Sequence, residues 1–125
     1  MTLEPTPSQT VGPFFTIGLC REAQNEVVPG GSVHVVGHVL DGNGEPVSDA
    51  LIELWQPEGW GRCGTDAAGS FEFLTERPKG GYADVMVFAR GLLRHVVTRC
   101  EFGDDEVVQF DVHLQGDDQT VFFDV

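Results

Sequence analysis

Short stretches of alternating apolar and polar residues dominate the chain from residue 32 onward. SVHVVGHVL at 32–40 alternates, DGNGEP follows at 41–46, and ALIELWQ at 50–56 is again extended and largely apolar. A period of two is typical of a strand with one buried face, and Asp-Gly sequences are typical of tight turns. We therefore predict a β-hairpin over 32–56.

The same pattern predicts further strands, each bounded by turn residues. FEFLTE at 71–76 follows TDAAGS, YADVMVFA at 82–89 follows RPKGG, and HVVTRCEF at 95–102 follows a bend at Gly91. VVQFDVHLQ at 107–115 alternates, TVFFDV lies at 120–125, and ARGLLRH at 89–95 is the one plausible helical turn. Short strands about ten residues apart predict an all-β protein, an antiparallel sandwich or partly open barrel.

One hydrophobic core is expected, because 125 residues suffice for one domain and not comfortably for two. Residues 1–13 hold three prolines and no hydrophobic period, so we predict an extended N-terminal arm and lead-in over 1–31 and a single sandwich domain over 32–125. The apolar positions predicted for the core are Val33, Val35, Val39, Leu51, Trp55, Phe71, Phe73, Val85, Val87, Phe110, Val112 and Leu114.

Charge narrows the range of partners. Twenty acidic residues against seven basic ones give a net charge of −13, which repels nucleic acid and anionic membrane surfaces. Three arginines, Arg90, Arg94 and Arg99, still lie within ten positions and could receive a small carboxylate. The three cysteines form no CxxC pair and no apolar stretch approaches the roughly 20 residues of a membrane span, so we expect a cytoplasmic protein.

The strand at 82–89 carries the candidate chemistry. Its period places Tyr82 and Asp84 on one face, about 7 Å apart, with the small aliphatic residues on the other. Asp84 could act as a general acid or base and Tyr82 could orient a ligand, which makes both candidate catalytic residues. Charged residues on a half-exposed strand are common, however, and Asp84 could simply pair with an arginine. Arg90 would lie about 20 Å from Asp84 on a straight strand.

A metal site is not predicted from the pattern. His34 and His38 share a strand face but are about 13 Å apart, too far for two imidazoles to bind one ion. His95 and His113 lack a neighbouring ligand pattern, and Cys63 in GRCGTD has no histidine near it in sequence. All are expected to have structural or solvated roles.

Several segments together resemble one family. TPSQTVGPFFTIGL at 6–19, GHVLDGNGEPVSDALIELWQ at 37–56, GWGRCGTDAAGSFEF at 59–73, VFARGLLRHVVTRCEF at 87–102 and FDVHLQGDDQTVFFDV at 110–125 are similar to the intradiol ring-cleaving dioxygenases, and within them to the protocatechuate 3,4-dioxygenase alpha-subunit family. That resemblance implies a β-sandwich. It also implies a catalytic beta-type partner that holds ferric iron through two tyrosines and two histidines and opens a catechol ring with oxygen.

The resemblance further implies that the alpha subunit lacks a working iron site and lends residues to its partner's pocket. Thr10, Gly12 and Pro13 match the arm segment that lines that pocket, and Arg90 matches the arginine that reaches towards it. The loop with the first tyrosine ligand is absent, because only Pro57 and Glu58 separate WQ from GWGR, and Tyr82 and Asp84 fall near the positions of the histidine ligands. We expect no cofactor in this chain and ferric iron only in a partner.

Three functions remain open. The first is an alpha-type subunit in a hetero-oligomer with a dioxygenase beta-type subunit, completing a pocket for an aromatic carboxylate or catechol-like molecule. The second is a metal-free enzyme acting on an aromatic or polyketide-like molecule through Asp84, Tyr82 and Arg90. The third is a non-enzymatic interaction module. An oligomer, homomeric or heteromeric, is expected because the apolar VFF near the last residue is natural interface material.

Overall fold

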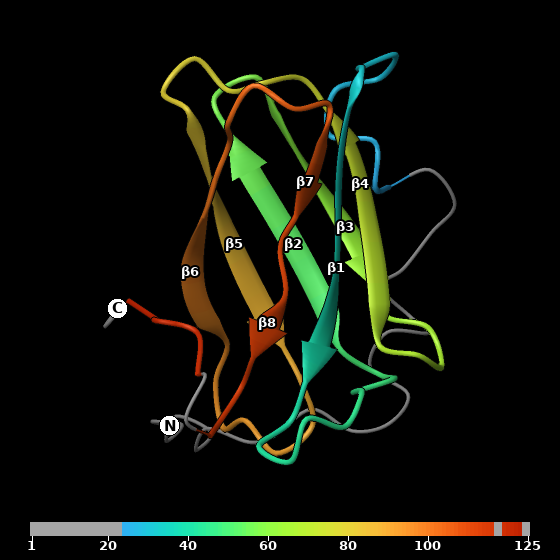
Figure 1. Ribbon diagram of the computed structural model, residues 1–125, viewed down its shortest axis with the longest axis vertical. Helices are drawn as coiled ribbons and strands as arrows, with labels where there is room; N and C mark the ends of the chain where they lie inside the picture. Colours follow the sequence, from blue (N-terminus) through green and yellow to red (C-terminus); the bar gives the residue numbers. More distant parts are fainter. Residues whose placement is uncertain (1–23, 117–118, 124–125) are drawn as a thin grey trace, which may run out of the picture.

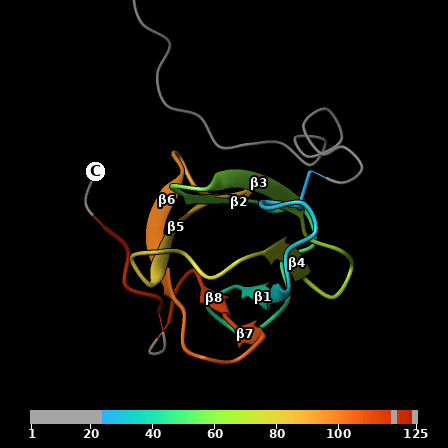
Figure 2. The same ribbon diagram turned by 90° about the horizontal axis from the view of Figure 1, so that it is seen from above.

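A computed structural model describes residues 24–116 and 119–123, in which the chain forms two four-stranded β-sheets packed face to face (Figures 1 and 2). One sheet has the order β3-β2-β5-β6, and the other has β4-β1-β7 with β8 also paired to β1. The strands are β1 (Val33–Leu40), β2 (Leu51–Gln56), β3 (Gly59–Gly64), β4 (Ser70–Thr75), β5 (Tyr82–Phe88), β6 (Val96–Glu101), β7 (Val107–Gln109) and β8 (Val112–His113). The all-β sandwich predicted from the alternation is confirmed.

Most strand pairs are antiparallel, as predicted, and the exceptions involve β1. Strand β1 pairs antiparallel with β4 but parallel with β7 and β8. Strand β2 pairs antiparallel with both β3 and β5, and β5 pairs antiparallel with β6. The parallel pairs arise because β7 and β8 return along β1 after the chain has crossed over from the other sheet.

The predicted hairpin over 32–56 is wrong, because β1 and β2 belong to different sheets. The turn chemistry itself is real, since one carboxylate oxygen of Asp41 accepts hydrogen bonds from the backbone N–H groups of Asn43 and Glu45, each at 2.9 Å. After that turn the chain pairs with β1 only briefly, through the antiparallel bridge between Leu40 and Pro46 and the backbone N–H that Val47 donates to Val39. Residues 46–50 carry it across to the opposite sheet, where β2 finds β3 and β5 as neighbours.

The core lies between the two sheets and contains most of the predicted residues. Val35, Val39, Phe73 and Val87 are fully buried, while Phe110 and Leu114 pack against the core and are half-buried. The prediction that Trp55 lies in the core is wrong, because this residue is 42% exposed. Leu51 is buried as predicted, whereas the β2 side chains that enter the space between the sheets are Ile52 and Leu54, so Trp55 falls on the outer face.

The break between β7 and β8 depends on a glycine in β1. A Cβ atom at Gly37 would lie 1.8 Å from the carbonyl oxygen of Phe110, closer than any side chain tolerates. At this point Phe110 donates its backbone N–H to Val36, and the Asp111 carboxylate accepts the backbone N–H of His38 at 2.9 Å. Gly37 therefore lets the chain switch from β7 to β8 while staying bound to β1.

Both edges of the sheet that contains β2 are covered by other parts of the chain. Residues 24–28 lie between β3 and β4, where Arg62 donates its backbone N–H to Gln24 and Val27 donates to Leu74. At the other edge Phe123 donates its backbone N–H to Val97 of β6 at 2.7 Å. The apolar segment at 120–125 was predicted to be interface material, and within its described part Phe123 contacts β6 of its own chain while Val121 stays 79% exposed.

Two other expectations concern the arm and the loop after β5. The arm, residues 1–23, lies outside the described residues, whereas its lead-in contributes the buried Val27 to the core. The predicted helical turn at 89–95 is wrong, because that stretch consists of turns and bends that connect β5 to β6. No helix in the described part of the chain is long and apolar enough to cross a membrane.

Candidate functional site

The outer face of the β3-β2-β5-β6 sheet carries the polar and aromatic residues singled out in β5. Ala83, Val85, Val87 and Ala89 are buried, whereas Tyr82 is 40% exposed and Asp84 is half-buried. The division of β5 into a core face and a mixed face is therefore confirmed. Neighbouring strands add Trp55, Trp60 and Arg99 to the same region through their pairing with β5 and β2.

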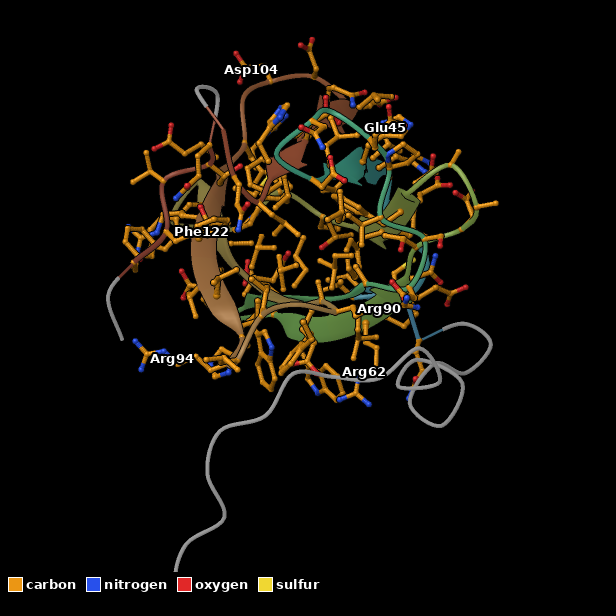
Figure 3. All side chains as sticks on the ribbon, turned by 90° about the horizontal axis from the view of Figure 1, so that it is seen from below. Glu45, Arg62, Arg90, Arg94, Asp104 and Phe122 are labelled. Carbon is orange, nitrogen blue, oxygen red and sulfur yellow. The ribbon has the colours of Figure 1, made fainter. Side chains whose placement is uncertain are left out.

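A closed cluster of four side chains spans β2 and β3 on this face. Glu53 lies opposite Arg62, and its carboxylate accepts the guanidinium at 2.7 Å while also accepting the indole N–H of Trp55 at 3.2 Å. Trp55 stacks on Trp60 with ring centroids 5.0 Å apart, and the Arg62 guanidinium lies 5.2 Å from the centre of the Trp60 ring. Because Glu53 binds both the Arg62 guanidinium and the Trp55 indole, its carboxylate can be buried without being unpaired. Figure 3 shows Arg62 outside the space between the sheets.

A second cluster lies on β5 and β6. Arg99 stands opposite Asp84, and its guanidinium lies 3.9 Å from the centre of the Tyr82 ring and 5.3 Å from that of Phe123. Its Nε is 3.5 Å from an Asp84 carboxylate oxygen, an ion pair between two half-exposed side chains. Asp84 is thus paired with an arginine, which is one of the two roles considered for it from the sequence.

A hollow of about 290 Å³ separates the two clusters. Its walls are formed by Trp55 and Tyr82, with Asp84, Gln56, Pro57 and Gly80 completing the lining. Trp60 stacks behind Trp55 without lining this hollow.

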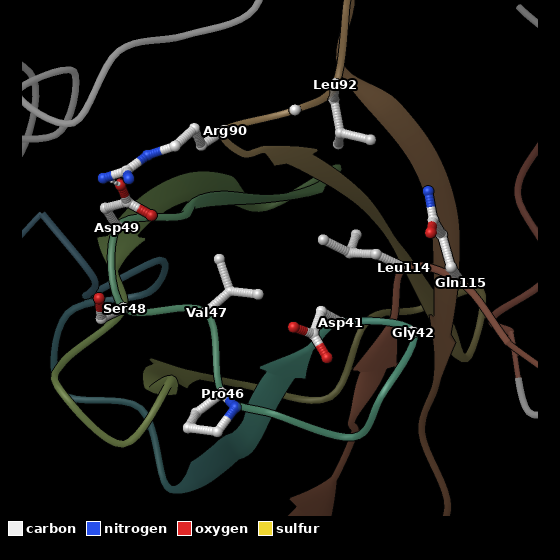
Figure 4. Close-up of a pocket in the computed structure, with 11 residues that line it drawn as sticks. Asp41, Gly42, Pro46, Val47, Ser48, Asp49, Arg90, Leu92, Leu114 and Gln115 are labelled. Atoms are coloured by element: carbon white, nitrogen blue, oxygen red, sulfur yellow. Dashed lines mark hydrogen bonds and ion pairs between the residues drawn. The ribbon is translucent and has the colours of Figure 1, made fainter.

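Arg90 lies at the other end of β5 and lines a different hollow of about 380 Å³ (Figure 4). Its guanidinium points to the carboxylate of Asp49, with which it forms an ion pair, and Val47, Leu92 and Leu114 supply apolar lining. The Arg90 side chain is 59% exposed and that of Asp49 is 17% exposed. Arg90, Tyr82 and Asp84 therefore share no hollow among the described residues.

Iron does not fit the residues at Tyr82. Tyr82 and Asp84 would offer one phenolate and one carboxylate, and the Arg99 guanidinium already occupies one face of the tyrosine and pairs with the carboxylate. A fixed positive charge at this position opposes a ferric ion. Within the described residues, histidine, cysteine, aspartate and glutamate nowhere gather in threes that could hold a metal ion.

Two histidines, His34 and His38, and two cysteines, Cys63 and Cys100, have surroundings that suggest no catalytic role. His34 pairs with Glu72 at 2.8 Å and His38 lies 3.5 Å from Asp111, on exposed strand surfaces. Burial raises the pKa of the Cys63 thiol, and burial followed by the Glu101 charge raises the pKa of Cys100 to about 12. Both thiols are therefore poor nucleophiles at neutral pH.

Some candidate residues cannot be placed and others were missed. Thr10, Gly12 and Pro13 lie outside the described residues. Asp49, the partner of Arg90, is 41 positions away in sequence and no local pattern connects the two. Glu53 could have been recognised, because a charge within LIELWQ marks the face of β2 that points away from the core.

Solved structures of similar shape define the class of fold. The dioxygenase domain of a dioxygenase and carbohydrate-binding fusion protein from Streptomyces sp. SirexAA-E superimposes with a TM-score of 0.59 at 21% identity, covering 90% of this chain and 99% of that one. Catechol 1,2-dioxygenase from Pseudomonas arvilla C-1 gives a TM-score of 0.58 at 18% identity, over 74% of this chain and 54% of that one. The fold is the β-sandwich of intradiol dioxygenases.

Sequence comparison is more specific. No family model matches, but the chain is 32% identical to a protocatechuate 3,4-dioxygenase alpha chain from Burkholderia cepacia over 195 aligned positions, 99% of each chain. It is 26% identical to the Pseudomonas putida alpha chain over 98% of its length, and 28% identical to a B. cepacia beta chain over 70% of its length and 51% of that chain. The chain belongs to the protocatechuate 3,4-dioxygenase alpha-chain family. The alignment with the B. cepacia alpha chain spans 195 positions, about 70 more than the 125 residues of this chain, so that relative carries segments that are absent here.

Proposed function

We propose that this protein is a shortened alpha-type subunit of an intradiol dioxygenase of aromatic-compound metabolism, which binds no iron itself and completes the pocket of a beta-type partner. The observation that carries the proposal is the match to two alpha chains along nearly the whole length. The charge of Arg99 at Tyr82 and Asp84 supports the iron-free assignment. The match to a beta chain supports a partner of related fold.

The contribution of this chain to the partner's pocket is assigned to the arm and to Arg90. Arg90 lies on the loop after β5 with its side chain largely exposed, so a second subunit can reach it without any change in the sandwich. A guanidinium keeps its charge at every working pH and can bind a carboxylate through two parallel hydrogen bonds. Thr10, Gly12 and Pro13 would line the same pocket from the arm.

The ion pair of Arg90 with Asp49 determines how Arg90 can bind the carboxylate of a ligand. Asp49 holds the guanidinium in the isolated chain, so an aromatic carboxylate has to replace Asp49 or bind to donors that Asp49 leaves unused. The Arg90 side of the pair is exposed, but the Asp49 carboxylate is only 17% exposed, so the incoming ligand or partner must compensate for the ion pair that Asp49 loses. Asp49 thus keeps Arg90 extended over its hollow until a ligand or partner arrives.

The test is purification alone and together with the beta-type subunit from the same organism. We expect the chain alone to be colourless and free of iron, and the complex to contain iron in proportion to the beta-type chain and to open the ring of protocatechuate. The matched control is the beta-type subunit purified alone. A burgundy chain that holds stoichiometric iron without a partner would refute the proposal, and so would ring opening at equal rate by the beta-type subunit alone.

A further inference from the structure

The outer face of the β3-β2-β5-β6 sheet carries an apolar patch, which we call the tryptophan patch. Trp55 and Trp60 stack on each other and are 42% and 43% exposed, and Met86 and Phe88 of β5 are half-buried on the same face. On the other sheet, by contrast, the phenylalanines of β4 belong to the core. A sheet face that meets water is normally polar, so the tryptophan patch indicates a surface that another segment covers.

The described connections between strands leave the tryptophan patch open. Strands β2 and β3 are separated by Pro57 and Glu58 alone, and the other connections lie at the two ends of the sandwich (Figure 1). The largest part of the chain outside the described residues is the arm, residues 1–23. The arm is therefore the first candidate for the cover.

The arm joins the described structure beside the patch. The carbonyl oxygen of Gln24 accepts the backbone N–H of Arg62 at 2.8 Å, and the Arg62 guanidinium lies 5.2 Å from the centre of the Trp60 ring. Neighbouring strands are about 4.8 Å apart, so β5 lies about 10 Å from β3. The chain from Leu19 to Gln24 spans up to about 17 Å when extended, which is enough to bring Leu19 to any of the three strands β3, β2 and β5.

The arm carries an apolar segment next to that point. In PFFTIGL at 13–19, Phe15, Ile17 and Leu19 alternate with Thr16 and Gly18. A period of two in an extended chain places the three apolar side chains on one face. Six extended residues reach about 20 Å, so the segment is long enough to cross the patch from β3 to β5.

Charge and tethering favour the arm over a second copy of the chain. The net charge of −13 makes two copies repel each other, whereas residues 1–23 hold only two acidic residues and one basic residue. A segment tethered by a few residues is present at an effective concentration on the order of millimolar. A second copy would need a comparable real concentration to compete with it.

We propose that residues 14–19 bind the tryptophan patch of their own chain, with Phe15, Ile17 and Leu19 against the aromatic and methionine side chains. The contact needs neither iron nor a partner, so it stands or falls independently of the proposed subunit function. It also leaves residues 10–13 available for the pocket of a partner.

The test uses tryptophan fluorescence, because both tryptophans of the sequence belong to the patch. Two truncations form a matched pair: removal of residues 1–12 keeps the apolar segment, and removal of residues 1–19 deletes it. We expect acrylamide to quench the chain without residues 1–19 about twice as strongly as the other two chains, because the segment shields the indole rings. Protection in the full-length chain should be equal at about 1 and 50 μM, because the contact lies within one chain.

Point variants test the segment without shortening the chain. Phe15→Ser and Ile17→Ser should each increase the quenching, whereas Val11→Ser, which removes an apolar side chain elsewhere in the arm, should not. These variants decide the question if the chain without residues 1–19 does not fold, which circular dichroism would show. In a mixture of labelled and unlabelled chains, nuclear Overhauser contacts between Ile17 and the Trp60 ring should arise within one chain.

Four results would overturn the proposal. Equal quenching of the full-length chain, both truncations and Phe15→Ser would show that the arm does not cover the patch. Protection lost on removal of residues 1–12 would place the cover in another part of the arm. Protection that increases with concentration would show that a second copy covers the patch, and protection that appears only with a beta-type chain would assign the cover to that partner.

Discussion

Arg90 is held by a carboxylate of its own chain, and this governs how it should respond to substitution. Its side chain is 59% exposed but its partner Asp49 is only 17% exposed, so Arg90→Ala should leave the chain folded and lower the free energy of unfolding by about 1 kcal/mol. The same variant should lower the affinity for benzoate-type ligands, in this chain or its complex, by about 1.5 to 3 kcal/mol, roughly tenfold or more. Denaturant titration and calorimetry measure the two effects.

Two matched variants accompany this prediction. Arg94→Ala removes an exposed arginine on the same loop and should leave benzoate affinity unchanged. Asp49→Asn keeps the shape of the Arg90 partner but not its charge, so it should raise benzoate affinity. Loss of the fold in Arg90→Ala, with unchanged affinity in the folded fraction, would show that this arginine is structural.

Cys100 links stability to alkaline pH. Its folded pKa of about 12 exceeds the ordinary value because burial disfavours the thiolate, so the folded state prefers the neutral thiol. The contribution of Cys100 to the free energy of unfolding is complete below the unfolded pKa of about 8.5. It is lost as the pH rises towards 12, at up to about 1.4 kcal/mol per pH unit. Urea unfolding of the native chain and of Cys100→Ala at pH 8 and pH 10 should show the difference in stability shrinking as the pH rises. A difference that is independent of pH would contradict this.

The faces of single strands could be predicted where charge and size agree. In β5 the small aliphatic residues mark the core and Tyr82 and Asp84 mark the outside, and both assignments are confirmed. In β2 the size of Trp55 suggested the core, whereas the charge of Glu53 on the same face indicated the outside. The charge was the better guide, because a buried glutamate needs a partner such as Arg62 and cannot face an apolar core.

Gly37 carries the switch from β7 to β8, which makes it a sensitive position in the sandwich. Gly37→Ala should destabilise the protein by about 3 kcal/mol, because its Cβ would overlap the Phe110 carbonyl and the two strands must separate. Gly103→Ala is the control, since a Cβ there meets nothing within 4 Å, and it should change stability by less than about 1 kcal/mol. Equal thermal unfolding of the two variants would contradict the role of Gly37.

The order of the strands in the two sheets could not be predicted from the sequence, because it depends on contacts between distant residues. The turn at Asp41 forms as predicted, but nothing in residues 46–50 distinguishes a return to β1 from a crossing to the opposite sheet. The parallel pairing of β1 with β7 and β8 joins residues about 70 positions apart and depends on the close approach at Gly37. Such long-range pairings leave no mark in local alternation.

The assembled state is a prediction for the whole molecule. The arm and its resemblance to pocket-lining segments lead us to expect more than a monomer at tens of micromolar in analytical ultracentrifugation. Removal of residues 1–12 should reduce the assembled fraction and the melting temperature together, because contacts between subunits stabilise the folded chain by mass action. A monomer whose stability is unchanged by that truncation would count against an interface formed by the arm.

The contacts at the two edges of the β3-β2-β5-β6 sheet bear on how the chain behaves before it assembles. Residues 24–28 lie beside β3, where Arg62 donates its backbone N–H to Gln24, and Phe123 lies beside β6, where it donates to Val97, so each edge is partly occupied by the chain itself. Exposed strand edges are the usual templates for uncontrolled polymerisation of β-proteins. In the proposed subunit, these contacts would reduce strand pairing between copies at this sheet before a beta-type chain is present, and recognition by that chain would fall to side chains on the faces of the sheet.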